Sequence, residues 1–130
     1  MSEMILGQGI DLVECGRIEE SINRFGERFL DRLFLASERD YCGRQKVPHR
    51  HFAARFAAKE AISKAFGTGI GEHLGWKDME ILRNESGEPK VTLHGKGLDL
   101  FQQKNGLRVL ISLTHTDNYA AATALLITRA

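Results

Sequence analysis

One segment, from Pro48 to Gly67, limits the possible folds of this chain more than any other. Proline is favoured in the first turn of a helix and glycine directly after the last turn. Between them lies a run rich in alanine and phenylalanine, which predicts one long helix ending near Phe66. Glu60 lies well inside this helix, with Lys64 one turn later. A carboxylate among such small apolar neighbours is unusual inside a helix, so Glu60 is a candidate functional residue.

The segment before this helix predicts a strand followed by short helices. The strand runs over residues 4–13 and contains Gly7 and Gly9, so we expect another part of the chain to approach its backbone closely. Apolar residues at helical spacing follow, and Gly26 divides them into two helices. They are Ile18, Ile22, Phe25, Phe29 and Leu33. A further short helix begins near Ser37.

The segment after the long helix predicts two strand pairs. A loop over residues 67–75 leads to strands at 79–83 and 90–94, joined by a turn around 84–87. A helix at 98–104 is closed by Asn105-Gly106, and strands at 108–114 and 119–128 meet at Asp117-Asn118. The order of elements lacks a regular βαβ rhythm. We therefore expect a small single α+β domain over residues 1–130, with a largely antiparallel sheet packed against the long helix.

Composition excludes several classes of protein. A net charge of +1 argues against a protein that coats nucleic acid. Cys15 and Cys42 match neither a disulfide framework nor a metal-knuckle spacing, so we expect reduced thiols. No apolar run approaches the roughly 18 residues that span a membrane, and the acidic N-terminal segment does not resemble a signal peptide. These features predict a cytoplasmic protein with no membrane or nucleic-acid partner.

Two carboxylates are candidate ligands or bases. Asp11 lies inside an apolar strand, either on its solvent face or as a metal ligand or base. Glu60 either forms a surface pair with Lys64, worth ~0.3–0.5 kcal/mol, or lies at the bottom of a shallow groove because the surrounding alanines give little cover. Taken singly, neither Asp11 nor Glu60 shows which of its two alternatives is correct.

Cations and glycines surround the same helix end. Gly67, Gly69 and Gly71 match no phosphate-loop motif, and they follow a helix whose C-terminal carbonyls repel phosphate. Phosphate can approach such a loop where cations offset the helix dipole, and bare backbone amides of the loop could then contribute. The nearby cations are Arg55, Lys59 and Lys64. His115 lies at the end of a later strand. Two carboxylates, several cations and a glycine loop together suit Mg²⁺ holding a polyphosphate, because Mg²⁺ often takes only one or two protein carboxylates.

Three segments together resemble one family, the holo-[acyl-carrier-protein] synthases, which are small bacterial 4′-phosphopantetheinyl transferases. They are Gly9-Ile10-Asp11-Leu12-Val13-Glu14 with Arg17-Ile18, then Arg55-Phe56-Ala57-Ala58-Lys59-Glu60-Ala61 continuing into Lys64–Gly71, and Ser112-Leu113-Thr114-His115-Thr116. The resemblance covers nearly the whole chain, in order. Two departures are that Met1-Ser2-Glu3 precedes Met4, where family members often begin, and that Cys15-Gly16 stands before Arg17. The first leaves the initiating methionine open, and the second leaves the first turn of the docking helix less well defined.

The resemblance implies a reaction and an assembly. Coenzyme A gives its phosphopantetheine arm to a serine of apo acyl carrier protein, as in fatty-acid biosynthesis, and adenosine 3′,5′-bisphosphate leaves. It implies Mg²⁺ held by Asp11 and Glu60, and a homotrimer with sites between subunits. Glu60, directly or through a metal-bound water, is the candidate base, and Lys64 a catalytic contact to phosphate. Contacts to coenzyme A are then expected from Arg55, Lys64, Gly67, Gly69, Gly71 and His115.

The acidic carrier protein requires a complementary surface. Arg17, Arg24 and Arg28 on the first helical region can supply it, with Phe25 or Phe29 as an apolar anchor. The alternative is that these arginines pair with local acids. Two other functions compete with the transferase: a Mg²⁺-dependent phosphotransferase or pyrophosphatase that needs no carrier, and a non-enzymatic module that binds an acidic protein or nucleic acid through the arginine helix.

Overall fold

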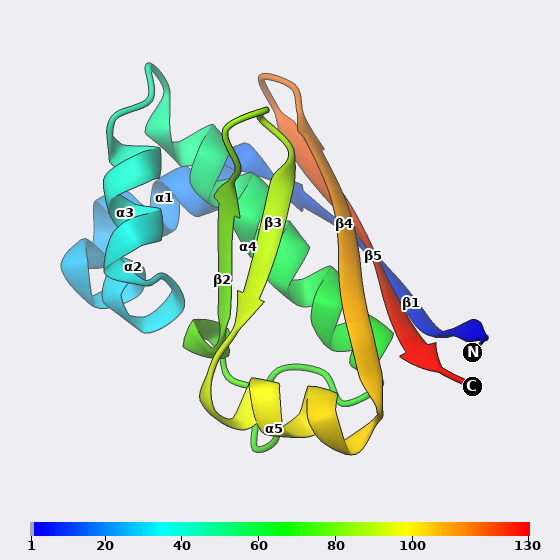
Figure 1. Cartoon of the computed structure of the whole chain (residues 1–130). Coiled ribbons are helices and arrows are strands. Elements are labelled where there is room, and N and C mark those ends of the chain that lie inside the picture. Colours follow the sequence, from blue (N-terminus) through cyan, green and yellow to red (C-terminus); the bar gives the residue numbers. More distant parts are fainter. Residues whose placement is uncertain (1) are drawn as a thin grey trace.

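Three antiparallel strands form the main sheet of the computed structural model, which describes residues 2–130. Their order is β1 (Glu3–Glu14), β5 (Tyr119–Arg129) and β4 (Gly106–His115). A separate antiparallel hairpin, β2 (Met79–Arg83) and β3 (Pro89–Leu93), lies beside β4 (Figure 1). Met1, and with it the open choice of initiating methionine, lies outside the described residues.

The long helix occupies the centre of the molecule. Helix α4 (Pro48–Phe66) crosses one face of the sheet, and three short helices gather beside its N-terminal half (Figure 1). These are α1 (Cys15–Phe25), α2 (Glu27–Leu33) and α3 (Ala36–Gly43), while η1 (Trp76–Asp78) and α5 (Gly95–Gln103) flank the hairpin. The predicted α+β class, with a largely antiparallel sheet against the long helix, is confirmed. Within residues 2–130, no helix is both long enough and apolar enough to cross a membrane.

Glycine and alanine allow α4 to lie directly on the sheet. A Cβ atom at Gly9 would stand 1.9 Å from the carbonyl oxygen of Ala61, and one at Gly7 would stand 1.9 Å from that of Ala65. On β5, the neighbouring strand, the side chains that face α4 include Ala120, Ala122 and Ala124, all buried. The prediction that something approaches the two-glycine strand closely is confirmed, and the approaching element is α4.

Most predicted boundaries agree with the structure. Gly67 ends α4 in the left-handed conformation (φ 82°), and Gly26 (φ 58°) separates α1 from α2. The last helix, however, begins at Gly95 rather than residue 98. Its first turn contains Gly95 and Gly97, which weaken the helical pattern in the sequence. Glycine is favoured at position 97 because a Cβ there would lie 2.8 Å from Leu74 Cδ1 and 2.9 Å from Asp78 Cβ.

Candidate active site

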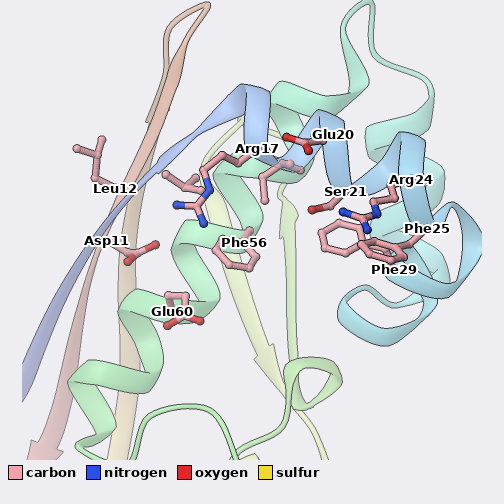
Figure 2. Close-up of a pocket in the computed structure, with 12 residues that line it drawn as sticks. Asp11, Leu12, Arg17, Glu20, Ser21, Arg24, Phe25, Phe29, Phe56 and Glu60 are labelled. Carbon is pink, nitrogen blue, oxygen red and sulfur yellow. The ribbon is translucent and has the colours of Figure 1, made fainter.

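A cleft of about 500 Å³ lies between the end of β1, helix α1 and the middle of α4. Asp11 of β1 and Glu60 of α4 both line it, as Figure 2 shows. The lining also includes aromatic and cationic side chains from α1, α2 and α4, namely Arg17, Arg24, Phe25, Phe29 and Phe56. Two carboxylates that lie 49 residues apart in the sequence (11 and 60) therefore share one cavity.

The alternation of β1 directs Asp11 toward the helix. Side chains at every second position share one face of a strand, and the glycines that contact α4, Gly7 and Gly9, are in phase with Asp11. The Asp11 side chain is only 17% exposed, and Lys64 Nζ donates to its Oδ1 at 3.2 Å and to Ile10 O at 2.9 Å. Asp11 is therefore not on the solvent face of the strand, which was one of the two predicted alternatives.

Glu60 occupies an electrostatically unfavourable position for an ionised carboxylate. Burial, and next the negative charge of Asp11, raise the pKa of Glu60, and the Lys64 ammonium opposes them. Proximity of two carboxylates disfavours ionisation of both, so a cation between them is stabilising. The Lys64 ammonium supplies part of this positive charge through its ion pair with Asp11. Among residues 2–130, no group of three His, Cys, Asp or Glu side chains converges to hold a metal ion.

The residues predicted to contact coenzyme A do not line this cleft, namely Arg55, Lys64, Gly67, Gly69, Gly71 and His115. Arg55 is 1% exposed, and its Nε donates to Ile81 O at 3.0 Å while its guanidinium lies over the ring of Tyr41. His115 lies beside His51, with ring centroids 5.0 Å apart. Burial, followed by the nearby His115, Arg55 and Arg83, lowers the pKa of His51. Within the described residues, Arg55 Nη2 is buried without a partner.

The glycine loop and Lys59 differ from expectation. The amides of Gly67 and Gly69 donate to Ser63 O, and the amide of Gly71 donates to Leu74 O. The amides of these three glycines are therefore not bare, because the helix end and the loop accept hydrogen bonds from them. Lys59, considered as a cation near phosphate, is instead fully buried and bonded within the protein.

The arginines of α1 and α2 are available to a partner. Among residues 2–130, Arg17, Arg24 and Arg28 form no ion pair. Three of the nearby acids that the sequence offered as partners are engaged elsewhere: Glu19 with His49, Glu27 with Arg39, and Asp31 with Lys77. The alternative of local pairing is therefore not what the structure contains.

Sequence reasoning missed part of the aromatic wall. Phe56, one turn before Glu60, stacks on Trp76 with ring centroids 5.2 Å apart, and Phe56 lines the cleft. The i, i+4 spacing of Phe56 and Glu60 places them on one helix face, and this spacing could have indicated that Phe56 lines the same cleft as Glu60. No sequence pattern indicates Trp76, because η1 reaches α4 only through the tertiary fold.

Comparison with known proteins identifies the family. The model of the 4′-phosphopantetheinyl transferase superfamily matches residues 7–124. This chain belongs to that superfamily. The resemblance drawn from the sequence is confirmed, and with it the assignment as a transferase enzyme rather than a binding module.

Individual transferases match over almost their full length. The holo-[acyl-carrier-protein] synthase of Koribacter versatilis is 46% identical over 123 residues, which are 95% of this chain and 98% of that protein. The structure of the Helicobacter pylori synthase in complex with coenzyme A has a TM-score of 0.82 at 34% identity, covering 92% of this chain and 98% of that one. The structure of a Bacillus anthracis synthase in complex with CoA (3′,5′-ADP) has a TM-score of 0.81 at 31% sequence identity, and the match covers 97% of this chain and 99% of that one.

Proposed function

We propose that this enzyme transfers 4′-phosphopantetheine from coenzyme A to a serine of apo acyl carrier protein, with Mg²⁺, and releases adenosine 3′,5′-bisphosphate. The observation that carries the proposal is the shared cleft of Asp11 and Glu60, bordered by the unpaired arginines of α1. The similar synthases in complex with coenzyme A support the choice of donor. The relatives named holo-[acyl-carrier-protein] synthase support the choice of acceptor.

The two carboxylates fit a magnesium ion. Mg²⁺ commonly takes one or two protein carboxylates and fills its remaining positions with water and substrate phosphate. The raised pKa of Glu60, caused by burial and next by Asp11, is the cost of holding two carboxylates in one cleft without such an ion. When bound, Mg²⁺ supplies neutralisation of the charge that develops on the phosphates.

The remaining steps are transfer of the phosphopantetheine group and removal of the serine proton. The serine oxygen of the carrier forms a bond to the β-phosphorus of coenzyme A, and the bond from that phosphorus to the bridging oxygen of the pyrophosphate breaks. The leaving oxygen stays with adenosine 3′,5′-bisphosphate. Glu60 accepts the serine proton as the general base, directly or through a water. Lys64, whose ammonium donates to Asp11 Oδ1, stabilises a phosphate oxygen.

The nucleotide end of coenzyme A requires a second set of residues. His115 lies outside the cleft of Asp11 and Glu60, which supports a homotrimer in which a neighbouring subunit supplies it. His115 is exposed beside His51 and suits direct contact with the phosphate groups of the nucleotide, whereas Arg55 Nη2 is buried and does not. Gly67, Gly69 and Gly71 allow close approach of the nucleotide to the backbone.

The outer face of the sheet supports the same assembly. Its side chains alternate with those that contact α4, and several large apolar residues there are exposed. They include Ile10, Leu12 and Leu110. A neighbouring subunit that covered this apolar face would shield it from water and bring a second chain close to β1, the strand that carries Asp11.

The carrier protein would dock on α1 and α2. Acyl carrier proteins are acidic, and Arg17, Arg24 and Arg28 are free of intramolecular ion pairs in the described chain. Phe25 is an exposed aromatic residue beside them, with Arg24 over its ring at 5.2 Å. Charge reversal at Arg24 should raise KM for the carrier and leave KM for coenzyme A unchanged. An equal rise in both would contradict docking on this surface.

The direct test is to incubate the protein with coenzyme A, Mg²⁺ and an apo carrier, and to weigh the carrier by mass spectrometry. The proposal expects the mass of one phosphopantetheine to be added, and no addition without Mg²⁺ or with Asp11→Ala or Glu60→Ala. Turnover of coenzyme A without carrier would instead indicate a pyrophosphatase. Near-normal transfer by either variant would refute the assignment of the cleft.

The location of the sites between subunits has its own test. Glu60→Ala protomers lack the base, and His115→Ala protomers lack a nucleotide contact. Mixed after unfolding and refolded together, they should regain part of the activity that each lacks alone, because some interfaces then combine two intact halves. Failure to regain activity in mixed trimers would show that each protomer contains its whole site.

A further inference from the structure

A fully buried ion pair lies directly beside the candidate site. Lys59 and Glu38 are both 0% exposed, and Lys59 Nζ donates to Glu38 Oε1 at 2.7 Å. The same ammonium donates to Leu33 O at 2.7 Å and to Trp76 O at 3.0 Å. All three of its protons are therefore used.

The carboxylate of the pair is equally occupied. Glu38 Oε1 also accepts from Leu35 N at 2.9 Å, and Oε2 accepts from Ile81 N at 2.9 Å. Through these bonds, one lysine of α4 and one glutamate of α3 connect the end of α2, the α2–α3 link, η1 and β2. Each of these segments contributes a backbone group to the network, and the bonds to Leu33 O and Ile81 N are buried.

Stability alone does not account for the pair. Removing two charges from water costs about as much as their attraction returns, and well-packed apolar side chains often replace such pairs without loss. What apolar side chains cannot do is fix the directions of four backbone groups from separate segments. The pair therefore specifies geometry, and it does so for α2 and α4, which line the cleft, and for η1, whose Trp76 stacks on the lining residue Phe56.

Two walls of the cleft depend on these bonds. Trp76 O is held by Lys59, and the Trp76 ring stacks on Phe56 at an interplanar angle of 23°. Phe56 lines the cleft one turn before Glu60 (Figure 2). At the end of α2, Leu33 O is held by the same ammonium, and α2 carries Phe29, which lines the cleft opposite.

We propose that Lys59 and Glu38 are positioning residues that hold the aromatic walls of the cleft, and the docking surface of α1 and α2, in register with Glu60. This inference rests on the proposed function for its kinetic consequence. A loosened pair leaves Asp11, Glu60 and Lys64 in place but allows α2 and η1 to shift. The carrier serine then arrives out of line with the phosphate, while binding of coenzyme A is retained.

The test uses two variants and a control. Glu38→Asp keeps the charge and withdraws the carboxylate by one methylene, and Lys59→Met with Glu38→Gln removes both charges. Leu126→Ala, in the buried core between α4 and the sheet, lowers stability without touching the pair. Trp76 is the only tryptophan of the chain, so acrylamide quenching of its fluorescence reports directly on its stack with Phe56.

Both pair variants should show faster quenching of Trp76 than the control at equal fraction folded. They should also lose about 10- to 100-fold in kcat/KM for the carrier, the usual effect of a shift near 1 Å, with KM for coenzyme A unchanged. Quenching and kinetics identical to those of Leu126→Ala would overturn the inference. If the double variant does not fold, Glu38→Asp decides. If the wild type transfers nothing, the proposed function fails, and quenching still decides whether the pair holds the stack.

Discussion

Replacing Gly9 by alanine should separate the two elements that carry the carboxylates. The new Cβ would lie 1.9 Å from Ala61 O, whereas Cβ contacts under 3.0 Å essentially do not occur. The difference, 1.1 Å, is the least distance by which β1 and α4 must move apart at this point. Backbone stands on both sides of the clash, so a rotamer change cannot relieve it. Asp11 lies two residues from Gly9, and Glu60 lies next to Ala61.

The expected effect has a stability part and a catalytic part. Overpacking of this kind costs about 1–3 kcal/mol of unfolding free energy. A displacement near 1 Å between two groups that act on one substrate costs about 10²-fold in rate. Gly9→Ala should therefore remain folded at moderate temperature but transfer phosphopantetheine about 10²-fold more slowly.

The assay combines urea unfolding, followed by Trp76 fluorescence, with the rate of holo-carrier formation. Gly43→Ala is the matched control, because nothing lies within 4 Å of a Cβ at Gly43. That variant should keep full activity and gain about 0.4–1 kcal/mol through the unfolded state. Wild-type stability and rate in Gly9→Ala would refute the reasoning, since α4 would then not need to touch β1 at this glycine.

Three further outcomes follow from burial and charge. Burial and next Asp11 raise the pKa of Glu60 in the folded protein above its value in the unfolded chain. The protonated carboxyl therefore favours the folded state: this stabilisation is fully present below the unfolded-state pKa and is lost as pH rises through the folded-state pKa. Glu60→Gln, neutral at every pH, should therefore melt higher than wild type at pH 7 without Mg²⁺, and the gain should vanish in melts at acidic pH. Burial raises the pKa of the Cys42 thiol to about 11 and also raises that of Cys15. Both thiols should resist a chromogenic disulfide reagent at pH 8 until the protein unfolds; rapid native labelling would contradict their burial. Ile10 is 66% exposed on the outer face of the sheet, so Ile10→Glu should keep the fold but disrupt the proposed trimer, as light scattering of wild type and variant would measure; a variant mass equal to that of a trimeric wild type would place the interface elsewhere.

The local signals in the sequence were sufficient for most of the fold. Pro48 and Gly67 mark the ends of α4 because their backbone preferences act within one turn. Gly26 separates α1 from α2 for the same reason. Gly7 and Gly9 indicated a close approach to β1, although not which element approaches, since the absence of a Cβ records only that space is needed.

The candidate site was predicted in part. Asp11 and Glu60 could be singled out as unusual carboxylates, and the structure places both in one cleft. The status of the acids near Arg17 could not be predicted, because Glu19 and Glu27 take partners from other helices. Such pairs depend on how α1 and α2 pack, which has no signature in the spacing of charges along one helix.

The two lysines of α4 show most clearly where sequence information ends. Lys59 and Lys64 lie in one helix, flanked by similar small residues. Only the packing of α3 and η1 against one side of α4 buries Lys59 with Glu38, while β1 on the other side leaves Lys64 half exposed beside Asp11. The sequence by itself determined the helix and its two cations. The tertiary structure decided which cation organises the interior and which pairs with Asp11, because the environment of a charge is set by segments distant in the chain.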